Sequence, residues 1–221
     1  MTTPSKIQLA LDTADLDAAV QAARRASVDI VEVGTVLVLH RGLDAVRALK
    51  RAVPHTPLVA DLRIARAGEM FASMAFEAGA DRVTVVGEAG RSVVAAAARA
   101  AAYHGGQIEV ELWEGWTESE LSDLLVDEVR RVIAHRPGGV PARDDKSTRQ
   151  NLRRLAGMSL QGREVTLAGG IGPGDLRYFT GLAFDVVAVG KAIANDPAPE
   201  KVTAQLRSEL EEVQTRHANQ V

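Results

Sequence analysis

Short apolar runs alternate with amphipathic stretches along the whole chain. Most runs are uninterrupted stretches of Val, Ile, Leu and Ala, as is typical of parallel strands that are buried on both faces. The pattern predicts strands at Ile7–Leu11, Asp29–Val33, Leu58–Asp61, Arg82–Val86, Gln107–Leu112, Arg131–His135, Glu164–Ala168 and Val186–Val189.

The stretches between these runs have helical periodicity, and several begin with a capping residue such as Asp15 or Thr117. They predict helices at Leu16–Ala26, Leu43–Ala52, Glu69–Ala78, Arg91–His104, Glu118–Asp127, Thr148–Ala156, Asp175–Gly181 and Pro199–His217.

Eight alternating strands and helices predict an α/β fold, namely a (β/α)8 TIM barrel that forms a single domain over residues 1–221. The alternative is a doubly wound open sheet. Eight regular units without a second domain favour closure of the barrel.

Composition narrows the range of functions. The chain has 26 Lys and Arg against 29 Asp and Glu. It therefore lacks the excess of basic residues that is typical of nucleic-acid-binding proteins. The absence of cysteine excludes disulfides, thiolate metal sites and Cys nucleophiles. No apolar run is long enough to cross a membrane and the first residues do not resemble a signal peptide, so we expect a cytoplasmic protein.

Polar residues or glycines follow almost every predicted strand, at the end of a barrel where active sites lie. Seven strand ends that converge on one mouth favour a ligand site over separate capping roles. These residues are Asp12, Glu32, Asp61 with Arg63, Glu109 with Glu111, His135 with Arg136, Gly169 with Gly170, and Gly190 with Lys191.

The last two strand ends indicate a phosphate site. Gly169, Gly170 and Gly190 allow backbone N–H groups to approach a ligand, and Lys191 adds a positive charge. In barrels, the loops after strands seven and eight often bind phosphate.

Glu32 and Asp61 end adjacent strands and could offer two carboxylates to Mg²⁺, which commonly takes one or two. The alternative is a structural ion network with Arg63 and Arg66. His135 is the histidine best positioned for proton transfer near neutral pH.

The sequence resembles the family of 3-keto-L-gulonate 6-phosphate decarboxylases and hexulose-6-phosphate synthases, within the orotidine 5′-monophosphate decarboxylase suprafamily. The similar segments run in order across nearly the whole chain. Among them are Gln8–Asp12, Asp29–Thr35, Phe76–Val85, Gln107–Glu109, Ala134–Arg136, Ala168–Gly170 and Val189–Lys191.

The resemblance implies a homodimeric barrel in which Glu32 and Asp61 hold Mg²⁺. It implies a phosphosugar bound by the Gly170 and Gly190-Lys191 loops, and cleavage through an enediolate. By the same resemblance, Glu109 and His135 handle the substrate and the proton, and Asp12 belongs to the site.

The third strand departs from the family pattern. The family has Asp-x-Lys-x-x-Asp, whereas this chain has Asp61-Leu-Arg63-Ile-Ala-Arg66. The second aspartate of the family reaches the neighbouring subunit's site, so Arg66 is expected there. Arginine is always protonated and cannot deliver a proton near pH 7, but it can hold a developing oxyanion.

Three functions follow as alternatives. The first is a Mg²⁺-dependent carboxy-lyase on a keto-sugar phosphate, with Asp61, Arg63, Glu109 and His135 as catalytic residues. In this function Asp12, Arg66, Arg136, Gly169, Gly170, Gly190 and Lys191 bind the substrate. The second is an aldolase of the hexulose-6-phosphate synthase type, and the third is a sugar-phosphate-binding protein without turnover.

Overall fold

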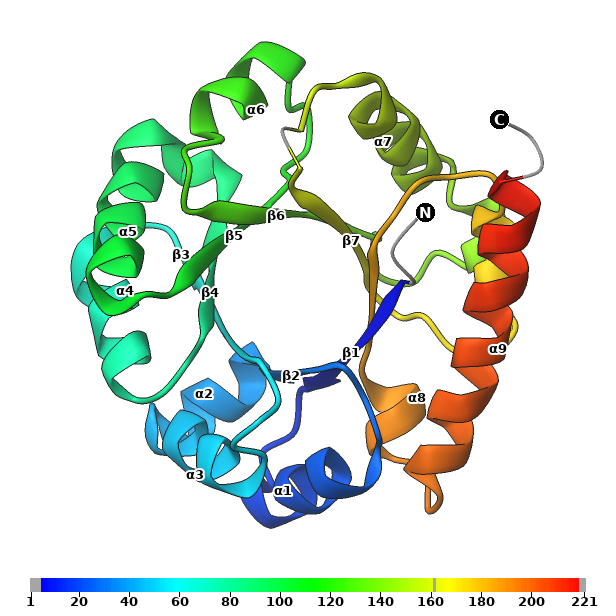
Figure 1. The fold of residues 1–221 in the computed structure, drawn as a ribbon, viewed down its shortest axis with the longest axis horizontal. Coiled ribbons are helices and arrows are strands. Elements are labelled where there is room, and N and C mark those ends of the chain that lie inside the picture. The colour runs from blue at the N-terminus through cyan, green and yellow to red at the C-terminus, as the bar shows by residue number, and fades with distance from the viewer. Residues whose placement is uncertain (1–4, 161, 219–221) are drawn as a thin grey trace.

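Eight parallel strands form a closed barrel in the computed structural model, which describes residues 5–160 and 162–218. Each strand pairs with the next along the chain, and β8 pairs with β1 to close the ring (Figure 1). The strands are β1 (Lys6–Leu11), β2 (Ile30–Val33), β3 (Leu58–Ile64), β4 (Arg82–Val86), β5 (Gln107–Glu111), β6 (Val129–His135), β7 (Glu164–Ala168) and β8 (Val186–Val189). The predicted barrel is confirmed.

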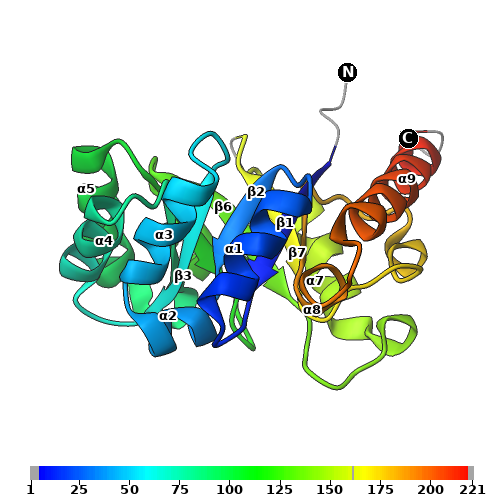
Figure 2. The same ribbon diagram turned by 90° about the horizontal axis from the view of Figure 1, so that it is seen from below.

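Helices surround the barrel and cover the outer faces of the strands, as the side view also shows (Figure 2). They are α1 (Leu16–Arg25), α2 (Thr35–Arg41), α3 (Asp44–Ala52), α4 (Gly68–Glu77), α5 (Gly90–His104), α6 (Glu118–Leu124), α7 (Lys146–Gly157), α8 (Lys191–Ala194) and α9 (Pro199–Ala218). Short 3₁₀ turns are η1 (Gly87–Ala89), η2 (Ala142–Asp144) and η3 (Leu176–Phe179). Within the described residues, no helix has the length and apolar character needed to span a membrane.

Local sequence explains where several helices begin. The Asp15 carboxylate accepts hydrogen bonds from the backbone N–H groups of Asp17 and Ala18 at the start of α1. Thr117 and Glu120 form a reciprocal capping box at the start of α6. Such caps satisfy donors that have no partner inside the helix.

The connections after β2, β3 and β8 differ from the sequence prediction. The chain turns into α2 directly after β2 and into α8 directly after β8, and β3 continues to Ile64 through an irregular register. The predicted helix at Asp175–Gly181 is only the short turn η3. All of these differences lie at connections, where tertiary packing overrides local periodicity.

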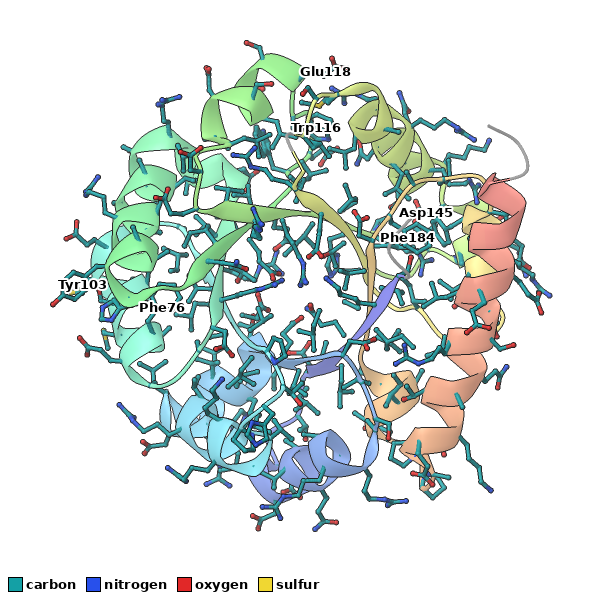
Figure 3. The ribbon with its side chains drawn as sticks, in the orientation of Figure 1. Phe76, Tyr103, Trp116, Glu118, Asp145 and Phe184 are labelled. Atoms are coloured by element: carbon teal, nitrogen blue, oxygen red, sulfur yellow. The ribbon has the colours of Figure 1, made fainter. Side chains whose placement is uncertain are left out.

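Side chains fill the ring of strands, so the barrel is not an open pore (Figure 3). Apolar residues of the strands and the inner helix faces form the main core, in which Leu9, Leu58 and Ile108 are fully buried. The inside of the barrel is polar on β1, β4, β5, β6 and β7, where Gln8, Arg131 and Glu109 are buried. This polar interior lies directly below the candidate site.

Candidate active site

A cavity of about 780 Å³ opens at the carboxyl ends of the strands. Every strand, or the loop that follows it, contributes a side chain or a glycine to its wall. The polar and glycine residues of the wall are Gln8, Asp12, Glu32, Thr35, Asp61, Arg63, Thr84, Glu111, His135, Thr166, Gly169, Gly170, Gly172, Asp175, Gly190 and Lys191. Most of the predicted site residues are therefore brought together.

Asp61 is held in one orientation by two hydroxyl groups. Thr84 donates a hydrogen bond to its Oδ1 at 2.7 Å, and Thr35 donates to its Oδ2 at 2.6 Å. Thr84 lies on β4 and Thr35 begins α2, so both neighbours of β3 position this carboxylate. Each oxygen keeps lone pairs that can face a ligand.

The position of the Asp12 carboxylate depends on Gly34, which follows β2. Its Oδ1 accepts a hydrogen bond from the backbone N–H of Val36 at 3.3 Å. A Cβ atom at Gly34 would lie only 2.3 Å from that oxygen, so any other residue there would displace the carboxylate. Gly34 thus allows Asp12 to reach the start of α2.

Glu32 lies among carboxylates with little compensating charge. Burial raises its pKa well above the ordinary value, repulsion from Asp61 adds to this, and a hydrogen bond from Gln8 offsets part of it. Repulsion from Glu109 and Asp12 contributes in the same direction. A bound cation would relieve this excess of negative charge.

The donor set fits a magnesium ion. Glu32 and Asp61 offer hard carboxylate oxygens at one side of the cavity, and Mg²⁺ commonly takes one or two carboxylates together with water and substrate oxygens. The described residues contain no group of three or more metal-ligating side chains in binding geometry. If the ion binds here, the protein would contribute these two carboxylates, and water and substrate would complete the coordination.

Arg63 points into the cavity because β3 is distorted at this residue. Its φ of 45° is unusual for a non-glycine residue, and the register with β4 shifts between Ala60 and Ile64. The backbone N–H of Arg63 donates to Thr84 at 2.9 Å. Its guanidinium donates to Oε1 of Glu111, also at 2.9 Å.

Glu111 ends β5 and also faces the cavity. Burial raises its pKa, and the positive charges of Arg63 and His135 offset this only in part. His135 ends β6, lines the same cavity and is exposed. The cavity mouth therefore brings a cation, a carboxyl group and an imidazole together.

Glycine backbone forms the opposite wall. Gly169 and Gly170 have φ values of 99° and 59°, which glycine adopts without strain. A Cβ atom at Gly169 would lie 2.9 Å from backbone atoms of Arg136. Gly190 and Lys191 continue this wall at the start of α8.

Arg136 is a structural residue of this wall. Its buried guanidinium donates to Asp145 at 2.9 Å, to the carbonyl groups of Gly169 and Gly170, and to that of Val140. These bonds engage all three of its nitrogen atoms. The guanidinium therefore fixes the Gly169–Gly170 loop, and the predicted contact of Arg136 with substrate stays a prediction.

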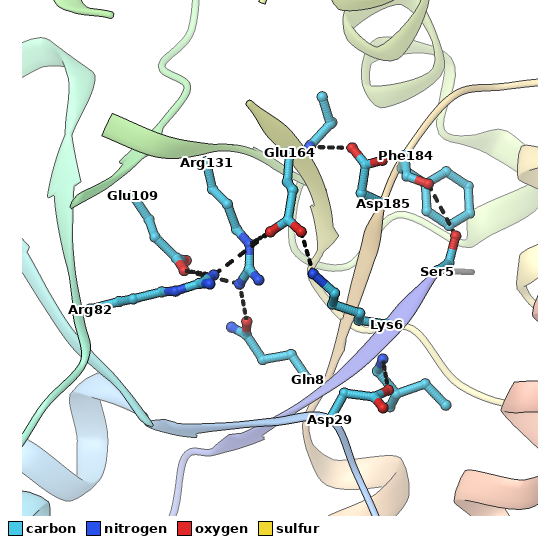
Figure 4. Close-up of polar contacts among 12 residues, drawn as sticks. Ser5, Lys6, Gln8, Asp29, Arg82, Glu109, Arg131, Glu164, Phe184 and Asp185 are labelled. Atoms are coloured by element: carbon cyan, nitrogen blue, oxygen red, sulfur yellow. Dashed lines mark hydrogen bonds and ion pairs between the residues drawn. The ribbon is translucent and has the colours of Figure 1, made fainter. Parts of the chain in front are cut away.

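Glu109 lies below the cavity in an ionic layer inside the barrel (Figure 4). Its fully buried carboxylate accepts from Arg131 at 3.0 Å and from Arg82 at 3.3 Å. The strand register that turns Glu109 inward turns Glu111 inward as well, one layer closer to the mouth. The predicted contact of Glu109 with substrate is not supported by this position.

The ionic layer reaches the site through Gln8. Arg131 donates to Oε1 of Gln8 at 3.3 Å, and Nε2 of Gln8 donates to Glu32. Arg131 also donates to Glu164, which forms an ion pair with Lys6 (Figure 4). Glu32 is thus oriented from below by a chain of side chains from β1, β6 and β7.

Comparison with known proteins shows the family of the chain. The sequence model of the orotidine 5′-phosphate decarboxylase / HUMPS family matches residues 5–206. The chain belongs to this family.

Several family members are similar over their whole length. The 3-keto-L-gulonate-6-phosphate decarboxylase of Escherichia coli strain K12 is 35% identical over 209 residues, which are 94% of this chain and 95% of the relative. The crystal structure of the same enzyme from Vibrio cholerae has 31% identity and a TM-score of 0.84, covering 96% of this chain and 99% of the other. The 3-hexulose-6-phosphate synthase of Salmonella typhimurium has 28% identity and a TM-score of 0.83, covering 94% and 99%.

The relatives that the chain matches include both kinds of enzyme that the sequence resembles. These relatives make or break carbon–carbon bonds, so the chain belongs to a family of carboxy-lyases and aldolases. Arg63 and Arg66 are its departures from the motif on β3. Arg66 is exposed and does not line the cavity of its own chain.

Sequence reasoning placed Glu111 at the predicted mouth without a specific role, and it assigned no role to Gln8, Thr35 or Thr84. All four residues line the cavity. For Glu111 a signal exists, because it follows Glu109 at a spacing of two on a strand. For the other three no signal exists, because neutral polar residues near strand ends are common in barrels.

Proposed function

We propose that this protein is a Mg²⁺-dependent lyase that decarboxylates a keto-sugar acid phosphate through an enediolate. The proposal rests on one observation, which is that a pair of carboxylates and a glycine-rich wall line the same cavity. The carboxylates of Glu32 and Asp61 lie at one side, and the glycine loops with Lys191 form another part of the wall. Similarity to 3-keto-L-gulonate-6-phosphate decarboxylases supports the same reaction.

Glu32 and Asp61 would hold the metal ion. A bound Mg²⁺ supplies positive charge to substrate oxygens as negative charge develops on them. Gln8 orients Glu32, while Thr35 and Thr84 orient Asp61, so the two carboxylates are prepared before the ion arrives. Such preorganisation lowers the cost of rearrangement during the reaction.

Gly170, Gly190 and Lys191 would bind the phosphate group. The glycines leave backbone N–H groups accessible to an anion, and the Lys191 ammonium adds a point charge suited to a phosphate. Holding the phosphate at this wall extends the sugar toward Asp61 and Arg63. Asp12, beside the start of α2, would accept hydrogen bonds from sugar hydroxyls.

Arg63 would hold the anionic part of the substrate that changes during cleavage. Its guanidinium stays positively charged at every working pH, so it stabilises an oxyanion rather than donating a proton. His135 lies across the mouth and would exchange protons with the substrate or with a water molecule.

We also propose a homodimer. Exposed apolar side chains occur on α2 at Val36 and Leu39 and on α4 at Met70, Phe71 and Met74. Both helices pack against β3, and Arg66 lies two residues before the start of α4. Burial of these side chains against a second copy would stabilise a dimer, and Arg66 would then lie at the edge of the partner's site.

The experiment is a turnover screen with keto-sugar acid phosphates and Mg²⁺, in which CO₂ release and the product mass are measured. Glu32→Gln serves as the inactive control. Formaldehyde with pentulose phosphates is tested in parallel, because similarity to hexulose-6-phosphate synthases favours an aldolase as the second candidate. CO₂ release without aldol product supports the decarboxylase. The cytoplasmic location stays a prediction.

A further inference from the structure

We propose that Arg131 is a positioning residue of the metal site, which acts on Glu32 through Gln8. It sets the direction of the Gln8 side-chain amide, so that the NH₂ group and not the carbonyl oxygen faces the Glu32 carboxylate. Arg131 does not line the cavity, so this role needs no contact with the ion or the substrate. The inference rests on the Mg²⁺ site of the function proposed above.

Three side chains form a line from the ionic layer to the site. Nη1 of Arg131 donates to Oε1 of Gln8 at 3.3 Å, and Nε2 of Gln8 donates to Oε2 of Glu32 (Figure 4). Arg131 is fully buried and Gln8 is 1% exposed. Among the described residues, Gln8 is the only one whose side chain or backbone donates a hydrogen bond to Glu32. The orientation of Glu32 therefore depends on one buried amide.

The chemistry of Arg131 decides which way this amide points. A guanidinium group has donors only and stays protonated, so it can pair only with the oxygen of the Gln8 amide. The flipped amide would place its NH₂ group against the guanidinium and its oxygen against the Glu32 carboxylate. Both contacts would then be repulsive in a place where water does not compensate for them. Arg131 thus excludes the flipped amide.

Arg131 is itself fixed by two acids. Nη1 donates to Glu109 at 3.0 Å, and Nε donates to Glu164 at 2.6 Å. Each acid also has a second cationic partner, which is Arg82 for Glu109 and Lys6 for Glu164. Arg131 is therefore held in place on two sides, and its replacement leaves neither acid without an ion pair.

A fixed amide prepares Glu32 for the ion. Gln8 engages Oε2, which leaves Oε1 of the carboxylate for a metal. A side chain that orients a metal ligand reduces the rearrangement that binding requires. If the amide could turn, its oxygen would repel the carboxylate in part of the molecules, and Mg²⁺ binding would have to reverse this.

The experiment is calorimetry of Mg²⁺ binding to the substrate-free protein. We expect Arg131→Met and Gln8→Met each to weaken Mg²⁺ affinity by about 10–100-fold, the usual cost of removing a group that orients a metal ligand. A direct effect of charge has the opposite sign, because removal of a positive charge favours a bound cation. Gln21→Met, at an exposed position of α1, should keep the parent affinity.

A double variant shows whether Arg131 acts through Gln8. If it does, Gln8→Met/Arg131→Met should bind Mg²⁺ with the affinity of Gln8→Met alone, because the amide that Arg131 orients is already gone. A merely structural role of Arg131 would instead make the two losses of affinity multiply, and this result would contradict the inference. Circular dichroism and the thermal midpoint of the metal-free proteins check that each variant is folded.

Arg131→Lys covers the case in which Arg131→Met does not fold. Lysine keeps the charge, but its donors lie on one atom, which cannot replace two separate nitrogens. It should pair with the carboxylates, which are stronger acceptors than an amide, and leave Gln8 without its partner. We therefore expect weaker Mg²⁺ binding than in the parent, and parent affinity in Arg131→Lys would contradict the inference.

The outcomes separate this inference from the function on which it rests. Mg²⁺ affinity of Arg131→Met equal to or tighter than that of the parent would overturn the positioning role and leave the metal site of Glu32 and Asp61 intact. A parent that binds no Mg²⁺ would contradict the metal site itself, and the role of Arg131 would fail with it.

Discussion

Arg63 and Glu111 form an ion pair of 2.9 Å at the mouth of the barrel. The pair joins one of the two residues that depart from the β3 motif of the family to a carboxyl group on β5. Arg63 is 47% exposed at its side chain and Glu111 only 11%, so the pair separates the buried acid from solvent. Partial exposure also leaves the Arg63 guanidinium accessible to a substrate anion.

Arg63 should act as an electrostatic clamp. We expect Arg63→Met to lower kcat by about 10²–10³-fold, the usual cost of removing one preorganised donor. Arg63→Lys should retain part of the activity, because lysine keeps the charge but not the planar group. Arg51→Met, an exposed arginine of α3, is the matched control. Steady-state kinetics check this, and equal activity of Arg63→Met and parent would contradict the clamp.

Glu32 should be required for binding of magnesium. Because burial and the carboxylate of Asp61 raise the pKa of Glu32, its charge opposes folding when no metal is bound. We therefore expect metal-free Glu32→Gln to be at least as thermally stable as the parent at pH 7 and to bind no Mg²⁺ in calorimetry. Glu88→Gln is the control. Mg²⁺ affinity of Glu32→Gln equal to that of the parent would show that the metal lies elsewhere.

Glu164 should make the fold sensitive to acid. Burial alone would raise its pKa, but hydrogen bonds from Lys6 and Arg131 lower it from 4.5 to about 2. Between these values the unfolded chain binds more protons than the folded one. Its stabilising effect is therefore complete above pH 4.5 and is lost as the pH falls toward 2.

Urea unfolding across this pH range measures the effect of Glu164. Glu164→Gln should flatten the fall in the free energy of unfolding below pH 4.5 and should lower stability at pH 7. Glu77→Gln, an exposed residue of α4, should behave as the parent. A parent-like acid profile for Glu164→Gln would refute the role of this ion pair.

The exposed apolar residues of α2 and α4 should form the dimer interface. Light scattering should give about twice the 23.5 kDa chain mass, and Leu39→Asp or Met74→Asp should give monomers. Tyr103→Asp is a matched control, because Tyr103 is 86% exposed on the outer side of α5 (Figure 3). A parent that stays monomeric at micromolar concentration rules out the dimer.

The barrel could be predicted from the sequence because most of its strands are uninterrupted apolar runs. The runs at Leu58–Asp61 and Val186–Val189 identify their strands without reference to the rest of the chain. The helix at Thr35–Arg41 was not predicted, because it is short and only Gly34 separates it from the preceding strand. Its position depends on packing against β3, which no local pattern records.

The sequence could predict only those site residues that lie at the carboxyl ends of the strands. Asp12, Glu32, Asp61 and His135 end strands or follow them directly, and they do line one cavity. Glu109 and Arg136 are also charged residues near the carboxyl ends of strands, but their side chains are buried in ion pairs. Which of two neighbouring charges faces a ligand depends on long-range partners such as Arg131 and Asp145.

The most direct test of the central claim is CO₂ release from 3-keto-L-gulonate 6-phosphate and related keto-sugar acid phosphates. It is measured with purified protein in Mg²⁺ and again after chelation. We expect release of one CO₂ per pentulose phosphate formed in Mg²⁺, loss of release on chelation, and recovery when Mg²⁺ is restored. Release that is unaffected by chelation, or no release from any of these substrates, would contradict it.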